Sequence, residues 1–194
     1  MIVECAPAKI NLALHVRCKR PDGYHELETL FAFLQHGDTI TLRRADETRF
    51  SVTGPFAAAL AGEGDNLVLR AASLFSAQFG DPGPLDIVLD KHLPVASGIG
   101  GGSADAAATL RALARLTGMA ADDPALFTIA EALGADVPAC LLGRSAVGTG
   151  KGEQLDPVAG LSDTPVLLVN PGVAVSTGPV FRAWDGVDRG GIGL

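Results

Sequence analysis

The chain has 194 residues, of which 47% are hydrophobic, and it carries a net charge of −7. That length and composition suffice for a buried core, whereas the acidic balance argues against nucleic acid as a partner. Cys5, Cys18 and Cys140 are too widely spaced for a zinc motif or a disulfide framework, and the absence of a long apolar run or a basic leader predicts a cytoplasmic protein without a membrane partner.

The first third of the chain has the pattern of β-strands. Apolar and polar residues alternate from 9 to 16, which predicts a half-buried strand. The turn sequence at 21–23 follows, and the apolar run 27–34 is predicted to return as the partner strand. Residues 39–42 and 50–52 are predicted as two further short strands.

The middle of the chain mixes helix and strand signals. Asn66 can cap a helix whose apolar stripe runs through Phe75. Residues 85–89 alternate again and are predicted as a strand. A glycine cluster then leads directly into an alanine-rich helix, which is predicted to end at Gly118.

The last third begins with a second helix signal. Asp123 and Pro124 open a helix that is predicted to stop at Gly134. An apolar, strand-like run at 137–142 follows, and residues 166–169 are predicted as a last strong strand. Strands and helices in this irregular order predict an α+β fold.

The glycine cluster before the alanine-rich helix is the most specific feature of the sequence. Gly98 and the run Gly100 to Gly102 place no side chain between the backbone N–H groups and a ligand. The helix that follows directs the positive end of its dipole at the same spot. The segment therefore predicts a phosphate site, with a nucleotide as the first candidate ligand. The structural alternative is a flexible turn that leads to a helix capped by Ser103.

Three familiar phosphate-binding loops do not fit this segment. A P-loop needs a lysine after its last glycine, and none follows Gly102. The dinucleotide fingerprint fails because Ser103 stands where its last glycine belongs, and the segment is far from the first strand. The protein-kinase loop lies between two strands and does not precede a helix.

Lys9 and Asp136 are the candidates for moving a phosphoryl group. Such a reaction needs a cation beside the phosphate and a base for the attacking hydroxyl. Lysines are scarce in this chain, so one on a short apolar strand could serve as a compact point charge. Asp136 stands between apolar segments, where Lys9 would be a suitable counter-ion. The alternatives are a solvated strand lysine and a capping or turn aspartate.

Three more residues are candidates for ligand contacts. The Ser103 hydroxyl could bind Mg²⁺, cap the helix, or do both. Tyr24 and His25 follow an exposed turn, where they could stack on and hydrogen-bond a flat base. An ordinary pair of turn residues is the alternative for these two.

Four segments taken together resemble the GHMP kinase superfamily of small-molecule kinases. They are Ala6–Leu12, Asp22–Leu27, Leu93–Ala107 and Gly134–Pro138. The first two narrow the resemblance to the branch that acts on diphosphocytidyl-methylerythritol. The resemblance covers nearly all of the chain to about Phe181.

The resemblance implies a reaction and a set of roles. The reaction is ATP-dependent phosphorylation of the 2-hydroxyl of diphosphocytidyl-methylerythritol in non-mevalonate isoprenoid synthesis, with Mg²⁺ as cofactor. By resemblance, Asp136 takes the proton from the acceptor hydroxyl and Lys9 supports it. The glycine segment would wrap the ATP phosphates. Its implied ATP-binding residues are Pro94, Val95, Ala96, Ser97, Gly98, Ile99, Gly100, Gly101, Gly102, Ser103 and Ala104.

The resemblance also implies how the rest of the substrate is bound. The cytidine end, which carries the diphosphate, would be held by Tyr24 and His25. An aromatic ring, Phe181, would lie on the other side of the base. Asn11 would face the methylerythritol part of the substrate.

The implied architecture is a GHMP kinase fold. Residues 1–160 would form its N-terminal, ATP-binding domain, which is of the ribosomal protein S5 domain 2-like kind. Residues 161–194 would begin a C-terminal domain, of which we expect only part to be present. Two alternatives stay open: a module that binds nucleotide or the cytidyl ligand without catalysis, and another kinase of the superfamily acting on mevalonate or homoserine. Tyr24 and His25 disfavour the second.

Overall fold

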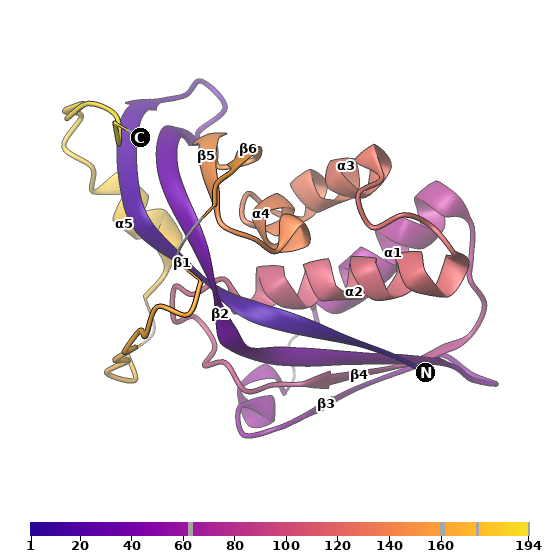
Figure 1. Cartoon of the computed structure of the whole chain (residues 1–194). Coiled ribbons are helices and arrows are strands. Elements are labelled where there is room, and N and C mark those ends of the chain that lie inside the picture. The colour runs from indigo at the N-terminus through magenta and orange to yellow at the C-terminus, as the bar shows by residue number, and fades with distance from the viewer. Residues whose placement is uncertain (62–63, 160–161, 174, 194) are drawn as a thin grey trace.

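A mixed β-sheet with helices packed on one of its faces forms the body of the molecule (Figure 1). The computed structural model describes residues 1–61, 64–159, 162–173 and 175–193. The strands are β1 Ile2–Lys19, β2 His25–Arg44, β3 Arg49–Thr53, β4 Leu85–Asp90, β5 Ala146–Gly150 and β6 Gln154–Pro157. The helices are α1 Leu67–Phe79, α2 Gly101–Thr117, α3 Pro124–Leu133, α4 Val137–Leu142 and α5 Thr177–Arg182, with a 3-10 turn, η1, at Ala57–Leu60. The predicted α+β fold is confirmed.

The long antiparallel hairpin of β1 and β2 organises the sheet. The sheet order is β3-β4-β2-β5-β6, and β1 also pairs with β2. The N-terminal half of β2 pairs with β5 over residues 27–31, and its C-terminal half pairs with β4 over residues 39–44. The prediction of separate strands at 27–34 and 39–42 is therefore wrong. One strand runs through both segments because its ladder with β1 continues past Gly37, where β1 bulges near Pro7.

Gly37 of β2 lies so close to the backbone of β1 that a side chain has no room. A Cβ atom at this position would collide with the backbone carbonyl of Ala6 and lie 2.7 Å from Pro7 Cα. Gly37→Ala is therefore expected to lower the free energy of unfolding by about 1–3 kcal/mol, because the backbone of β1 must shift. Urea denaturation measures the change. Gly64→Ala is the control, since no atom of the described residues lies within 4 Å of its Cβ position; an equal loss there would contradict the account.

The helices cover one face of the sheet through an apolar core. Asn66 caps α1 by accepting a hydrogen bond from the Val68 N–H at 2.9 Å, as the sequence predicts. The buried side of α1 is formed by Val68, Ala71 and Phe75. α2 packs on β1 and β2, and α1 packs on α2. The alternating residues of β4 complete the core from the sheet side.

The start of α2 differs from the sequence prediction. Gly100 occupies the cap position with a left-handed φ of 67°, and no side chain caps the helix. The alternative in which Ser103 caps the helix is therefore wrong, because the helix begins earlier, at Gly101. A glycine cap leaves the first N–H groups of α2 without a side-chain partner.

Two apolar runs predicted as strands have other structures. Residues 137–142 form the buried helix α4, whose first turn contains Pro138. A short apolar run cannot be assigned to strand or buried helix by periodicity alone. Residues 166–169 pair with no strand in the described part of the chain, and Leu167 and Val169 are 87% and 81% exposed. This run has strand propensity but no neighbouring strand edge to pair with.

The C-terminal segment returns to the end of the β1–β2 hairpin where the turn joins the two strands (Figure 1). The Gly190 carbonyl oxygen lies 2.7 Å from His15 Nδ1. Arg17 donates to Asp188 at 2.9 Å. None of the helices in the described ranges combines the length and the apolar character that a bilayer span requires.

Candidate active site

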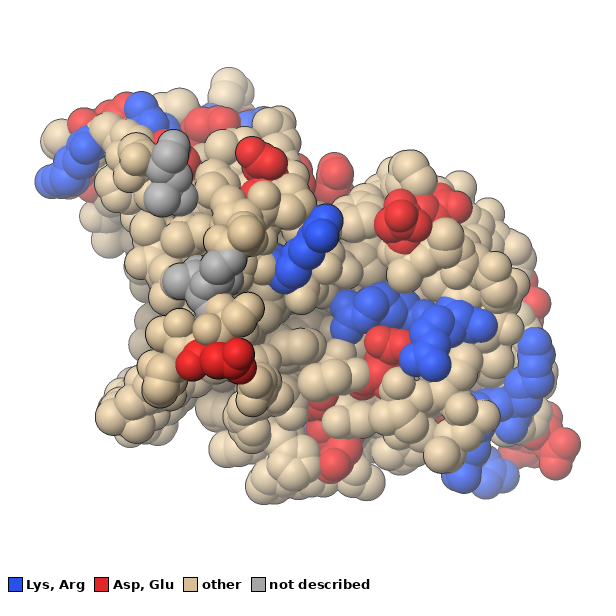
Figure 2. All heavy atoms as spheres, viewed as in Figure 1, with Lys and Arg blue, Asp and Glu red and all other residues tan. Residues whose placement is uncertain are grey.

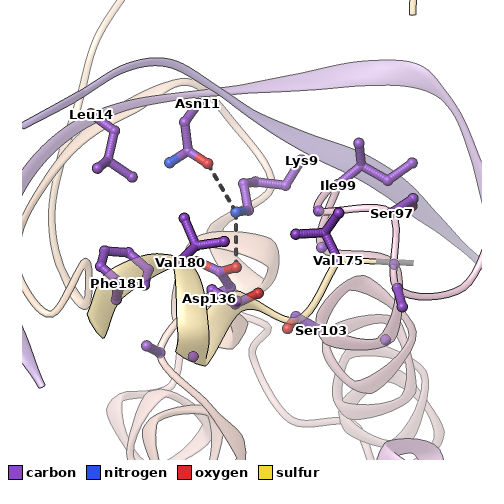
Figure 3. Close-up of a pocket in the computed structure, with 18 of the residues that line it drawn as sticks. Lys9, Asn11, Leu14, Ser97, Ile99, Ser103, Asp136, Val175, Val180 and Phe181 are labelled. Carbon is purple, nitrogen blue, oxygen red and sulfur yellow. Dashed lines mark hydrogen bonds and ion pairs between the residues drawn. The ribbon is translucent and has the colours of Figure 1, made fainter. Parts of the chain in front are cut away.

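A single large cavity of about 2090 Å³ collects most of the residues that the sequence singles out. Its walls come from β1 and β2, the glycine segment, the first turns of α2, the residues just before α4, and the C-terminal segment that includes α5. Figure 3 shows the part where β1, α2 and α5 face one another. All four lysines of the sequence line the cavity: Lys9, Lys19, Lys91 and Lys151.

Basic and acidic side chains are mixed both on the outer surface and in the cavity. The face shown in Figure 2 carries basic and acidic side chains side by side. Arg111 and Arg115 of α2 are ion-paired with Glu4 of β1. Four aspartates line the same cavity, and both Lys9 and Lys91 are ion-paired with aspartates, so charges of both signs meet there as well.

The glycine segment forms one wall of the cavity. Residues Pro94 to Ser103 line it, whereas Ala104 is buried in the core. Ala96, Gly98 and Gly100 have φ angles of 53°, 76° and 67°, which is left-handed backbone that costs free energy at a non-glycine residue. The Ile99 carbonyl accepts a hydrogen bond from the Lys9 N–H at 2.9 Å, so the segment is fixed directly to β1.

Lys9 and Asp136 meet in this cavity, as the sequence predicts. Lys9 Nζ lies 2.8 Å from Asp136 Oδ2 and 3.1 Å from Asn11 Oδ1 (Figure 3). Lys9 and Asn11 are two positions apart on β1 and therefore share a face of the strand. Asp136 occupies the cap position of α4 but its side chain makes no capping hydrogen bond, so the carboxylate is directed at the lysine instead.

The two partners of this ion pair differ in exposure. The Lys9 side chain is 4% exposed and the Asp136 side chain 40%. Asp136 is thus a half-exposed group on the cavity wall, where a hydroxyl of a bound ligand can reach it. The sequence predicts that Asp136 lies among apolar segments. The helix that it begins is buried, as predicted, but its carboxylate is partly exposed.

A short chain of hydrogen bonds holds Asn11 in place. Asn11 Nδ2 donates to Thr29 Oγ1 at 2.7 Å, and the Thr29 hydroxyl donates to the Ala13 carbonyl at 2.8 Å. The Asn11 oxygen therefore points at Lys9 Nζ, and the ammonium has a fixed position between an amide and a carboxylate. Thr29 is a supporting residue that no motif in the sequence indicates.

Aromatic residues gather at the other end of the cavity. His25 is 9% exposed and stacks on Phe181 with ring centroids 5.5 Å apart, and the Trp184 ring meets it edge-on at 5.7 Å. Tyr24 is 51% exposed, with Lys151 Nζ 5.0 Å from its ring centroid. The prediction that both residues are exposed is therefore confirmed for Tyr24 and wrong for His25, which the rings of Phe181 and Trp184 cover.

The contact between His25 and Phe181 bears on how a base can bind. A flat ring inserted between two rings needs a separation of about 7 Å, twice the contact distance of ~3.5 Å. The observed 5.5 Å leaves no such gap. A base can stack between these two rings only if α5, which carries Phe181, moves outward. Trp184 and Lys151 are neighbours of this site that sequence reasoning missed.

Ser103 is the remaining sequence-predicted site residue. It is the third residue of α2, lines the cavity, and points its hydroxyl toward the region of Asp136 (Figure 3). Across residues 1–61, 64–159, 162–173 and 175–193, no three His, Cys, Asp or Glu side chains gather as a metal site. A metal held here would therefore depend on ligand oxygens as well as on Ser103.

A second group of charges, which the sequence did not suggest, is buried beneath the glycine segment. Lys91 Nζ lies 2.6 Å from Asp38 Oδ2 and 2.7 Å from Asp105 Oδ2, and all three side chains are at most 4% exposed. Burial raises the pKa of Asp105 to about 7; the Lys91 ammonium opposes the rise, and the Asp38 carboxylate adds to it.

This raised pKa predicts a pH-dependent difference between the wild type and Asp105→Asn. The folded state binds more protons than the unfolded state between the ordinary pKa of 3.8 and about 7, so the carboxyl lowers stability as pH rises through that window. The free energy of unfolding of the wild type, relative to the variant, should fall by on the order of 2 kcal/mol from pH 5 to pH 8. Urea denaturation at both pH values measures it; parallel profiles would contradict it.

Comparison with known proteins gives one family and close relatives. Residues 66–144 match the family described as GHMP kinases N terminal domain. A Rhizorhabdus wittichii protein named 4-diphosphocytidyl-2-C-methyl-D-erythritol kinase is 58% identical over 191 residues, which cover 96% of this chain and 65% of the relative. A Sphingopyxis alaskensis protein of the same name is 51% identical over 191 residues, covering 96% and 68%.

A solved structure gives the same result. The crystal structure of a 4-(cytidine 5'-diphospho)-2C-methyl-D-erythritol kinase superposes with a TM-score of 0.74 and 42% sequence identity. The superposition covers 94% of this chain and 64% of that one. The chain thus spans about two thirds of the length of the relatives it matches.

Proposed function

Because the chain belongs to the 4-diphosphocytidyl-2-C-methyl-D-erythritol kinase family of the GHMP kinase superfamily, we propose that it takes part in ATP-dependent phosphorylation of the 2-hydroxyl of that substrate. This step belongs to the non-mevalonate route to isoprenoid precursors. The observation that carries the proposal is the Lys9–Asp136 pair at 2.8 Å, in one cavity with the glycine segment.

Asp136 is the proposed base and Lys9 the proposed cation. The acceptor hydroxyl oxygen attacks the γ-phosphorus, and its proton passes to the Asp136 carboxylate. The bond from the γ-phosphorus to the β,γ-bridging oxygen breaks, and its electron pair leaves with ADP. The Lys9 ammonium, fixed by Asn11 and Asp136, offsets negative charge on the phosphoryl oxygens during transfer.

The glycine segment is the proposed site of the ATP phosphates. Its glycines at 98 and 100–102 admit phosphate oxygens close to the backbone, and the uncapped N–H groups of α2 point at the same space. In the proposed division, residues 1–160 form the ATP-binding domain and residues 161–194 begin the second domain.

Mg²⁺ is the proposed cofactor, and the residues present fit it. Kinase sites hold this ion with one or two protein oxygens together with substrate phosphates and water. The Ser103 hydroxyl, at the start of α2 and on the cavity wall, is the proposed protein ligand. When bound, the ion neutralises phosphate charge.

The aromatic end of the cavity is the proposed site of the cytidine diphosphate group. Tyr24, His25 and Phe181 would contact the base, and Asn11 the methylerythritol part. The Lys151 ammonium beside Tyr24 is suitably placed for the diphosphate. Binding in this mode requires α5 to open the contact between Phe181 and His25.

His25→Ala is expected to raise KM for the cytidyl substrate about tenfold and to leave the nucleotide dissociation constant within about twofold, because a base contact is ground-state binding. Steady-state kinetics and calorimetry with ADP measure the two values. His36→Ala, a substitution of a histidine that also lines the cavity, is the matched control. An equal loss of nucleotide affinity in His25→Ala would contradict the assignment.

The proposed activity is tested by mixing the chain with ATP, Mg²⁺ and the cytidyl substrate and following ADP release. The Rhizorhabdus wittichii relative serves as the reference for assay and substrate. Phosphorylated cytidyl product and preference over mevalonate and homoserine are expected. Binding of both ligands without turnover would favour the binding-module alternative, and turnover of mevalonate or homoserine instead would favour another kinase of the superfamily.

A further inference from the structure

The buried charges beneath the glycine segment come from three different parts of the chain. Lys91 directly follows β4, Asp38 belongs to β2, and Asp105 lies in the second turn of α2. Lys91 Nζ donates to one oxygen of each carboxylate, at 2.6 and 2.7 Å. Burying three charges costs desolvation free energy unless each charge is well partnered. We therefore examine what these three side chains hold in place.

The cluster holds both ends of the glycine segment. At the first end, the other oxygen of Asp38 accepts hydrogen bonds from the backbone N–H groups of His92 and Leu93, at 2.5 and 2.7 Å. At the second end, Asp105 belongs to the helix into which the segment leads. Lys91 donates to both carboxylates, so it connects the start of the segment with its end.

Lys91 also lies directly beneath the first residue of α2. A Cβ atom on Gly101 would be 3.2 Å from Lys91 Nζ. Asp105 Oδ1 is buried and has no hydrogen-bond partner among the described residues, so the Asp105 carboxylate is held by the one hydrogen bond that its other oxygen accepts from Lys91. The segment above contains left-handed backbone at Ala96 and Gly98, a conformation that persists only where the surroundings hold it.

We infer that Lys91 is a positioning residue for the nucleotide: by joining Asp38 to Asp105 it fixes the glycine segment on α2 and so sets the positions of the backbone N–H groups that receive phosphate. The inference rests on the proposed function in that it takes the glycine segment as the nucleotide site. Lys91 acts through the backbone and is distinct from Lys9, which faces the transferred group.

The test compares variants that keep or remove the connection. Lys91→Met/Asp105→Leu removes the ammonium with one carboxylate and so preserves the net charge. Asp105→Leu removes only the connection to α2 and leaves the Lys91–Asp38 pair intact, which guards against misfolding of the first variant. Asp105→Asn retains an oxygen acceptor for Lys91. Leu126→Ala, in the core at α3, is the control for lowered stability.

Two measurements are made on each chain: the dissociation constant for ADP by calorimetry and amide hydrogen exchange over residues 92–103. We expect both leucine-containing variants to bind ADP at least about tenfold more weakly, since losing one backbone hydrogen bond to a charged phosphate has an effect of about this size. We also expect them to exchange faster in that segment. Asp105→Asn should stay within about threefold of the wild type, as should Leu126→Ala.

The outcomes distinguish failure of the proposed kinase function from failure of the positioning role of Lys91. Wild-type ADP affinity and wild-type exchange in both leucine-containing variants would overturn the inference, as would an equal loss of affinity in Leu126→Ala. If the wild type itself fails to bind ADP, the proposed function fails, and the exchange rates over residues 92–103 still decide whether Lys91 holds the segment.

Discussion

Asp136→Asn is expected to reduce kcat about 10²–10⁴-fold, the range for loss of a general base. The carboxamide has nearly the shape of the carboxylate but cannot accept the proton of the acceptor hydroxyl. Asp136 makes no capping hydrogen bond in α4 and is half exposed, so the substitution removes a reactive group without removing a support of the fold. KM values should change little. The ADP-release assay measures the loss.

The neighbouring helix offers a matched control for this substitution. Asp123 caps α3 by accepting a hydrogen bond from the Ala125 N–H at 2.8 Å, and it does not line the cavity. Asparagine caps helices as well as aspartate does, so Asp123→Asn should keep wild-type turnover. Full activity in Asp136→Asn would remove the proposed mechanism.

Lys9→Met is the second large expected effect, with kcat reduced about 10²–10³-fold. Methionine preserves the length and the apolar stem of a side chain that is 4% exposed, and it removes the charge that opposes the developing phosphoryl charge. The fold should persist, because Asp136 remains 40% exposed to water once its partner is gone. Kinetics and urea denaturation together separate the loss of activity from a loss of stability.

Lys19→Met is the control for this variant, since Lys19 is an exposed lysine at the end of the same strand and lies on the rim of the cavity. Its kcat should stay within about threefold of the wild type, because the charge of an exposed side chain ten residues further along the strand is screened by solvent and salt. An equal loss of kcat in the two variants would show that Lys9 contributes only to the general charge of the cavity.

Local signals predicted much of the fold. The Asn66 cap, the alternation in β4 and the glycine that ends α2 each specify their element through short-range geometry. The failures lie where the partner of a segment decides its structure. Residues 137–142 became helix α4 against α2, and residues 166–169 have the propensity of a strand without an edge to join.

The candidate site likewise contains residues that could be predicted from the sequence and residues that could not. Lys9 and Asp136 could be selected because each is a charged residue in an apolar context, and the fold brings them to 2.8 Å. The Lys91 cluster could not be predicted, because charged residues are ordinarily exposed and nothing in the sequence pairs Asp38 with Asp105. The cover over His25 was missed for a similar reason: Trp184 reaches it only through the return of the C-terminal segment.

The central claim is that Lys9 and Asp136 act as one unit on the transferred phosphoryl group. Single-turnover transfer from ATP to the cytidyl substrate, measured for both single variants and for Lys9→Met/Asp136→Asn, tests it most directly. Groups that act together give non-additive losses, so the double variant should be within about threefold of Asp136→Asn alone. Losses that multiply in the double variant would contradict the claim.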